Sequence, residues 1–180
     1  MAVKTVQAVI NGQTHTLTYN ATTKKYEATV TAPSTSSYNQ NGHYYNVQIK
    51  ATDEAGNSVS KDATDTTLGS SLKLRVKEKV APVISITAPS SSAKLTNNKP
   101  VIKWTVTDSD SGVDPSTIKL IIDSQTITTG ITKTASGKNY TCSYTPTTAL
   151  SDGSHTIKIS ASDYDGNAAA QKSITFTVDT

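Results

Sequence analysis

The chain has 180 residues, of which 34% are hydrophobic and 17% are charged, and its formal net charge is +3. No run approaches the roughly 20 consecutive apolar residues of a membrane-spanning helix, and the N-terminal MAVKTVQAVI lacks the charged start and long apolar stretch of a secretory signal. The lysines are scattered, which excludes the clustered basic face of a nucleic-acid-binding protein, so we expect neither membrane insertion nor a nucleic-acid partner.

Residues 1–79 show the alternation of apolar and polar side chains that is typical of short β-strands. Tyr26, Ala28 and Val30 alternate in one stretch, and Val47 and Ile49 alternate in the next. A last strand is predicted over residues 72–76, and we expect five strands in this part of the chain.

The sequence KEKVAP, residues 77–82, joins this part to a strand that begins at Val83. A linker so short, and stiffened by Pro82, predicts a semi-rigid connection. We therefore expect an abbreviated domain over residues 1–79 and a complete domain over residues 80–180.

Residues 80–180 contain about seven short strands at the spacing of a β-sandwich. The clearest strand puts Ile102, Trp104 and Val106 on one face and polar side chains on the other. The predicted strands cover residues 83–87, 101–107, 118–123, a weak run near Ile127, 138–145, 155–162 and 173–178. Seven is the strand number of the smaller immunoglobulin-type sandwich, so the sequence predicts an all-β chain.

The two parts of the chain repeat one another. ATDEAGN at residues 51–57 matches ASDYDGN at residues 161–167, and AVINGQT at residues 8–14 parallels LIIDSQT at residues 120–126. The first part has no counterpart of the strands that contain Val83 and Trp104. Either the insertion SVSKDATDTTLGS folds over the exposed sheet, or a strand from a partner chain completes it. Self-completion is the preferred interpretation, because native sheet edges are usually covered internally.

Four motifs carry a resemblance to a known family. They are VAPVISITAPS, TDSDSGVDPSTIKLIID, the A-x-D-x-x-G-N turn that occurs in both parts, and TFTVD. With these motifs the whole chain resembles tandem bacterial immunoglobulin-like domains of phage or prophage tail-associated proteins and of bacterial surface proteins. The resemblance implies two tandem immunoglobulin-like β-sandwiches, the first abbreviated, and a role as spacer, adhesin or carbohydrate-contacting decoration.

The segment DSDSGVD spaces Asp108, Asp110 and Asp114 so that their oxygens could gather around Ca²⁺. The terminal Glu of an EF-hand loop is missing, and the alternative is a turn in which Asp side chains accept backbone amides. Asp114 followed by Pro115 then predicts the cap and first position of one helical turn.

The repeated turns that begin at Asp53 and Asp163 resemble the acidic motifs of cadherin-like modules. In such modules the linker supplies several more carboxylates, whereas KEKVAP supplies only Glu78. The turns are therefore interpreted as structural, with Gly56 and Gly166 adopting positive φ, and no cofactor is expected.

Aromatic and amide side chains cluster in SSYNQNGHYY, residues 36–45. Aromatic faces beside Asn and Gln are suited to sugar recognition, so this loop is the candidate ligand site. Tyr45 is instead expected on the inward face, as a tyrosine corner at the start of the following strand. The candidate binding residues are Tyr38, Asn39, Asn41, His43 and Tyr44.

No catalytic set is expected. His15, His43 and His155 are dispersed, and Cys142 alternates onto a core face, where it is expected to be inert. The single cysteine also excludes an intramolecular disulfide.

The sequence predicts a non-catalytic structural or display module, located on a phage tail or at the bacterial cell surface, with other virion or surface-protein subunits as partners. A Met-initiated chain without an export signal favours the virion. We expect a monomer. Two alternatives remain open: an adhesion module that binds a cell-surface glycan, and an assembly subunit that a partner strand completes.

Overall fold

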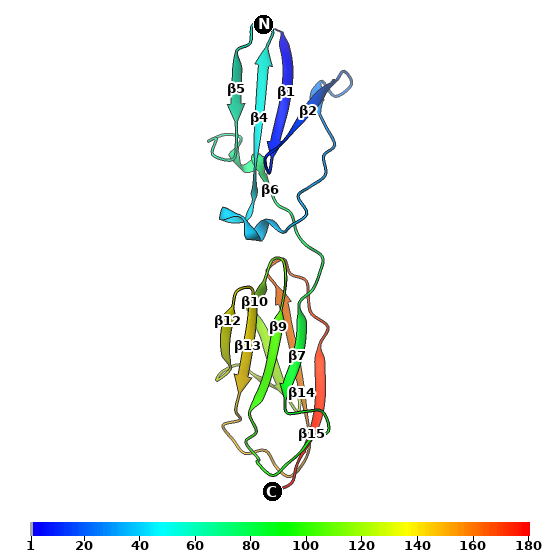
Figure 1. The fold of residues 1–180 in the computed structure, drawn as a ribbon, viewed down its shortest axis with the longest axis vertical. Helices are drawn as coiled ribbons and strands as arrows, with labels where there is room; N and C mark the ends of the chain where they lie inside the picture. The colour runs from blue at the N-terminus through cyan, green and yellow to red at the C-terminus, as the bar shows by residue number, and fades with distance from the viewer. Residues whose placement is uncertain (1) are drawn as a thin grey trace. The chain divides into compact units, whose positions relative to one another are not determined.

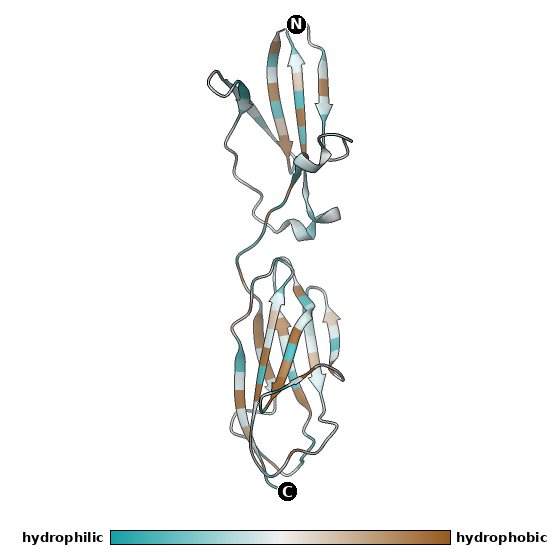
Figure 2. Cartoon of the chain, turned by 180° about the vertical axis from the view of Figure 1, so that it is seen from behind, coloured by the Kyte–Doolittle hydropathy of each residue, from teal (hydrophilic) through white to brown (hydrophobic). Residues whose placement is uncertain are grey.

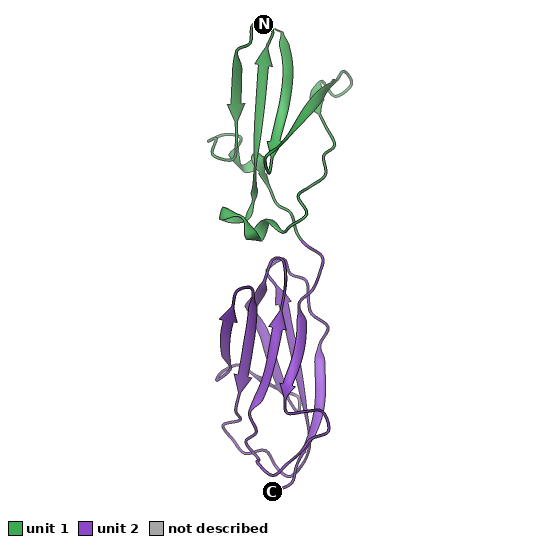
Figure 3. Ribbon diagram, viewed as in Figure 1, with its two compact units in different colours: residues 1–77 green, residues 78–180 purple. Residues whose placement is uncertain are grey.

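The computed structural model describes residues 2–180, which form β-strands joined by turns and three short 3-10 helices (Figure 1). The all-β prediction is confirmed. Contacts divide the chain into two compact units, residues 1–77 and 78–180 (Figure 3). The second unit thus begins two residues before the expected boundary at residue 80. No helix in the described residues is long and apolar enough to cross a membrane.

Unit 2, residues 78–180, is a sandwich of two sheets. One sheet has the strand order β11-β10-β14-β15-β8 and the other the order β12-β13-β9-β7. The strands are β7 (Val83–Ala88), β8 (Lys94–Leu95), β9 (Ile102–Thr107), β10 (Val113–Ile122), β11 (Gln125–Ile127), β12 (Thr132–Ser136), β13 (Asn139–Tyr144), β14 (Gly153–Asp163) and β15 (Lys172–Val178). The seven expected strands are present, and β8 and β12 are additional.

The core of unit 2 lies between its two sheets. Trp104 and Ile159 are fully buried, and Phe176 and Cys142 are 1% exposed. The alternation of hydrophobic and hydrophilic residues along these strands is visible in Figure 2. Burial raises the pKa of the Cys142 thiol to about 11, so this cysteine stays protonated and unreactive at neutral pH.

Unit 1, residues 1–77, contains one sheet with the order β3-β2-β1-β4-β5, and β6 pairs with β4. Its strands are β1 (Val3–Ile10), β2 (Gln13–Asn20), β3 (Lys25–Glu27), β4 (Tyr45–Asp53), β5 (Ser58–Lys61) and β6 (Lys73–Leu74). The 3-10 helices are η1 (Ser37–Asn39), η2 (Asn41–His43) and η3 (Gly69–Leu72). The described part of this unit, residues 2–77, thus has six strands where five were expected.

The strand ladders of the two units repeat in register. Ile10 pairs with Val47 and Ala8 with Ile49 in unit 1, just as Ile122 pairs with Ile157 and Leu120 with Ile159 in unit 2. These four paired residues of unit 2 are covered by the second sheet of the sandwich and are buried. Within residues 2–77 no second sheet is formed, and Ile10, Val47 and Ile49 are only half-buried. We call these three residues the uncovered face.

Three local predictions are wrong. The strand through Tyr26 ends at Glu27 and pairs with β2, because unit 1 has no counterpart of β9 for residues 28–30 to join. The first part of the insertion, residues 58–61, does not fold over the sheet, because strand β5 extends the sheet edge beside β4, and the buried Ala63 that follows bonds to Asn46 at the start of β4. Asp114 does not begin a helical turn, because it lies within β10, next to a register shift against β14.

His155, on β14, is a buried polar residue whose ring is fixed at both nitrogens. Its Nδ1 lies 2.5 Å from Asp123 Oδ2, and its Nε2 lies 2.8 Å from the Ser151 carbonyl. Burial alone lowers the pKa of His155, but the hydrogen bonds to Asp123 and Ser151 raise it, and the net direction is upward. The folded state therefore favours the imidazolium form.

We expect the stability of unit 2 to fall as pH rises above the ordinary His pKa of 6.5. The reason is that a raised folded pKa adds stability below the unfolded pKa, and this stability is lost as pH rises through the folded pKa. Asp123→Asn removes the carboxylate and is expected to cost about 1 kcal/mol at pH 6, since Asp123 is partly solvent-screened. The measurement is urea unfolding followed by the fluorescence of Trp104, the single tryptophan and a core residue of unit 2. If the free energy of unfolding depended on pH equally in the variant and the wild type, Asp123 would not be the group that stabilises the imidazolium form of His155.

Candidate functional site

The loop at residues 36–45 is fixed to unit 1 by backbone and hydroxyl contacts. The Ser37 N–H donates to the Val76 carbonyl at 2.8 Å, and the Ser37 hydroxyl accepts from the Val76 N–H at 3.2 Å. Ser36 Oγ caps η1 by accepting from the Tyr38 N–H. Both serines are buried, so the loop has a defined conformation.

The start of β4 anchors the other end of this loop. Tyr45 is 4% exposed, and its hydroxyl lies 2.6 Å from Thr35 Oγ1 and donates to the Thr35 carbonyl at 3.2 Å. Tyr45 therefore pins the entry to β4 from the inward face, at the position that His155 occupies in the register of unit 2.

Three of the predicted binding residues interact within the loop itself. The rings of Tyr38 and His43 stack with centroids 4.0 Å apart and planes inclined by 15°. His43 Nδ1 lies 2.8 Å from the Tyr38 carbonyl, and the Asn39 amide donates to the Ser36 carbonyl. Tyr38, Asn39 and His43 are not among the residues that line the neighbouring pocket.

The other two predicted residues, Asn41 and Tyr44, line a pocket of about 440 Å³, which we call the amide pocket. Most of its wall lies outside the predicted loop, because it comes from β1, the turn after it, and β4. The lining residues are Val9, Asn11, Gly12, Gln40, Asn41, Tyr44, Tyr45, Asn46 and Gln48. The turn signal of Asn11-Gly12 and the alternation along β4 are the sequence features that could have located them.

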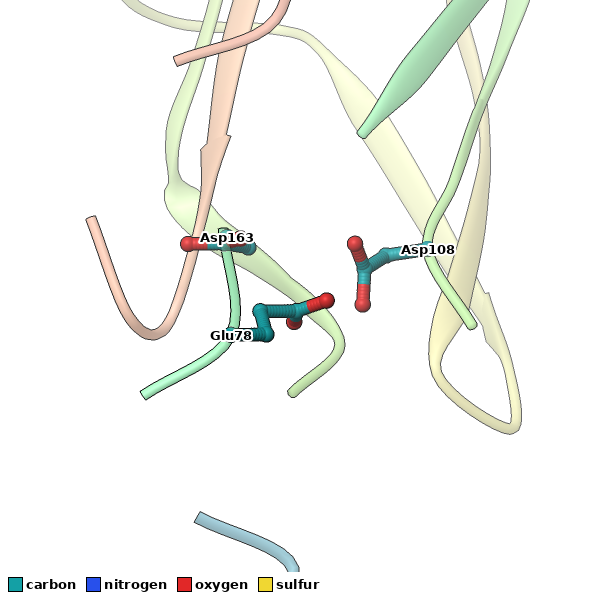
Figure 4. A group of neighbouring side chains, drawn as sticks. All are labelled: Glu78, Asp108 and Asp163. Atoms are coloured by element: carbon teal, nitrogen blue, oxygen red, sulfur yellow. The ribbon is translucent and has the colours of Figure 1, made fainter. Parts of the chain in front are cut away.

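In unit 2, three carboxylates meet from three separate segments: Glu78, Asp108 and Asp163 (Figure 4). One oxygen from each lies within 4.8 Å of the other two. Asp108 is thus grouped with Glu78 and Asp163 and not with Asp110 and Asp114, the partners suggested by the sequence.

Backbone and amide N–H groups hold these carboxylates. Glu78 Oε1 accepts from the Ser111 N–H at 2.6 Å, and Asp108 Oδ1 accepts from the Gly112 N–H at 2.7 Å. Asp163 accepts from the Asn167 N–H and the Asn167 side-chain amide. Carboxylate oxygens are also suitable ligands for Ca²⁺, but a calcium site needs six or more oxygens. The cluster ties Glu78 to the loop after β9 and to the turn after β14.

Asp114 has a separate, local role. Its Oδ1 accepts from both the Ser116 N–H at 2.9 Å and the Ser116 hydroxyl at 2.6 Å. This arrangement is a turn closed by a side chain, which is the alternative that the sequence offered to metal binding.

The repeated A-x-D-x-x-G-N turn has the same hydrogen bonds in both units. The Asn57 N–H donates to Asp53 Oδ1 at 2.8 Å, and the Asn167 N–H donates to Asp163 Oδ1 at 2.8 Å. The hydrogen bonds from Asn57 lower the pKa of Asp53 despite some desolvation. The motif is therefore explained by turn geometry in each unit.

Glu78→Gln tests how the acidic cluster is stabilised. Burial, with the negative charges of Asp108 and Asp110, raises the pKa of Glu78 although its hydrogen bond to Ser111 lowers it. The introduced carboxamide keeps an oxygen acceptor for the Ser111 N–H and removes the repulsion between Glu78 and the carboxylates of Asp108 and Asp110. In EDTA at pH 7 the midpoint of thermal unfolding of unit 2 should therefore rise by up to about 4 °C. The gain should vanish below the ordinary Glu pKa of 4.5, where the wild-type side chain is protonated.

The readout is thermal unfolding followed by Trp104 fluorescence. Glu54→Gln, in the exposed turn of unit 1, makes the same chemical change outside unit 2 and should leave the Trp104 transition unchanged. A midpoint that rises with added CaCl₂ in the wild type, and not in Glu78→Gln, would show that a cation and not N–H donors balances the cluster.

Residues 78–180, more than half of the chain, match the family model described as bacterial Ig-like domain. No curated protein sequence matches the chain significantly.

Solved structures similar to this chain include the fibronectin(III)-like modules of Clostridium thermocellum CbhA, with 22% identity, 98% of this chain and 78% of that chain covered, and a TM-score of 0.39. A chimeric titin Z1Z2 tandem has 13% identity, coverage of 96% and 82%, and a TM-score of 0.33. Bacteroides ovatus SGBP-B, of a mixed-linkage glucan utilization locus and in complex with a mixed-linkage heptasaccharide, has 20% identity, coverage of 97% and 38%, and a TM-score of 0.26. With TM-scores below 0.5, these similarities carry no argument about function.

Proposed function

The chain belongs to the bacterial Ig-like domain family, and from this premise we propose that it is a non-catalytic, cofactor-free display module of a phage tail or of a bacterial cell surface. Its partners are other subunits of the virion or surface assembly. Ig-like modules of this kind are generally non-catalytic, and their work is to present or space other parts of an assembly.

The observation that carries this proposal is that the single cysteine and two of the three histidines are held by contacts within the fold. Cys142 lies in the core with its thiol pKa raised to about 11. Both ring nitrogens of His155 have partners, and His43 bonds to the Tyr38 carbonyl. A catalytic site needs a nucleophile, a base or a metal set that converges on a cleft, and these groups serve stability instead.

Antibody labelling of the native source tests the display function. An antibody raised against residues 1–180 should label intact cells, or phage particles purified on a density gradient, without permeabilisation. The same antibody preincubated with the purified chain is the control. Detection only in the soluble fraction of lysed cells, with none on particles or intact cells, would contradict the proposal.

Assembly through unit 1 is a second candidate function, favoured by the uncovered face of Ile10, Val47 and Ile49. The equivalent Ile122, Ile157 and Ile159 of unit 2 lie under a second sheet, so strands of a neighbouring subunit could cover the face in the same way.

This second function predicts concentration-dependent association in static light scattering. Ile49→Lys should return the chain to a monomer, because a charge on the uncovered face opposes apolar packing. Val83→Lys, on an exposed edge position of unit 2, is the matched control and should associate like the wild type. A strictly monomeric wild-type chain at every concentration would rule out assembly through this face by a second copy.

A further inference from the structure

The amide pocket of unit 1 has a chemical character that none of the preceding roles uses. Five carboxamides, from Asn11, Gln40, Asn41, Asn46 and Gln48, line it together with the ring of Tyr44, and no charged side chain is among its lining residues. Its volume of about 440 Å³ falls in the range of roughly 300–1,000 Å³ that is typical of small-ligand sites.

The amides are positioned by the sheet on one side of the pocket. Val9 of β1 pairs directly with Gln48 of β4, so the ladder fixes the Gln48 side chain relative to the end of β1. Asn11 and Gly12 follow at once in a turn with φ values of 49° and 76°, which reverses the chain into β2 on the other side of β1 and leaves Asn11 at the end of the β1–β4 ladder. Left-handed φ at both positions is typical of Asn-Gly hairpin turns.

The opposite side is built by the loop at residues 36–45. Gly42 has a φ of 72°, and a Cβ at this position would lie 2.8 Å from Tyr44 Cε1, so only glycine allows the Tyr44 ring to sit where it does. Lys73 Nζ lies 4.9 Å from the centroid of the same ring. The aromatic wall is therefore held in place before any ligand arrives, which lowers the entropic cost of binding.

Most of the amides are available to a ligand. Within the described residues, the side chains of Asn11, Gln40, Asn41 and Gln48 make no hydrogen bond to the rest of the chain, and Asn46 uses only its Oδ1, which accepts from the Ala63 N–H at 2.9 Å. Each carboxamide offers donors and an acceptor. This mixture complements hydroxyl groups, which also donate and accept, whereas none of the lining residues carries a charge to pair with a phosphate or carboxylate ligand.

Unit 2 offers an internal comparison. The corresponding loop before β14 also lines a pocket, of about 520 Å³, but that wall carries the charged pair Asp123 and His155 and a single carboxamide, Gln125. Two lining positions are equivalent in the ladder register: Asn11 and Tyr45 of unit 1 stand where unit 2 has the Asp123–His155 pair.

We propose that the amide pocket of unit 1 binds a neutral saccharide, with the carboxamides of Asn41 and Gln48 and the ring of Tyr44 as the main contacts. The pocket gives the display module a recognition function. This inference does not depend on where the module is displayed, because it rests on the geometry of unit 1 alone.

Isothermal titration calorimetry of the full chain tests the proposal with defined probes. The neutral probes are maltohexaose, cellohexaose, mannohexaose and hexa-N-acetylchitohexaose, and oligogalacturonate is the charged probe. We expect at least one neutral hexasaccharide to bind, and Asn41→Ala and Gln48→Ala each to weaken that binding about tenfold through the loss of hydrogen bonds. Tyr44→Ala is expected to abolish it.

Gln125→Ala is the control variant: it removes a carboxamide that lines a pocket of unit 2 and should leave the affinity unchanged. Circular dichroism melting of each variant separates loss of contact from loss of fold, since Asn41 and Gln48 are not hydrogen-bonded through their side chains within the described residues. Failure of all four neutral probes to bind, preference for oligogalacturonate, or unchanged affinity in both amide variants would overturn the proposal. The display function would survive each of these results, because cell or particle labelling tests it separately.

Discussion

Burial of one sheet face against another is the interaction on which this molecule depends. In unit 2 the inward residues of β9, β10, β14 and β15 meet between two sheets, and Trp104, Leu120 and Ile159 are fully buried. Each such side chain contributes on the order of 1.5–3 kcal/mol relative to exposure, so these positions supply much of the driving force for folding. The single cysteine adds to this core and cannot cross-link it.

Unit 1 has the same strand ladder, but within residues 2–77 no second sheet covers it. Since Ile49 and Val47 are only half-buried, its hydrophobic stabilisation per strand is smaller, and hydrogen bonds at the sheet ends take on more of the structural role. Tyr45 bonds to Thr35, and Ser37 bonds to Val76, so the loop before β4 is tied to both flanking segments. The same hydrogen bonds that order this loop therefore also fix the side of the amide pocket that the loop builds.

The sequence predicted what depends on period and local turn chemistry. Alternation placed Trp104 and Ile159 in the core, and the repeated Asp-to-Asn turn was interpreted as structural in both units, in agreement with its hydrogen bonds. It could not predict which distant segments meet. Glu78 lies far along the chain from Asp163, and only the packing of the linker residue against two loops brings their carboxylates together.

The same limit explains the binding loop. Its composition pointed to five residues, of which Asn41 and Tyr44 line the pocket, whereas the rings of Tyr38 and His43 stack on each other. The residues that line the pocket include Gln48, whose alternation along β4 marks it only as a polar strand position. Whether an amide is part of a site depends on what the neighbouring strand and turn place beside it. The repeat within the chain shows this, because Asn11 lines the amide pocket in unit 1, whereas the equivalent Asp123 in unit 2 pairs with His155.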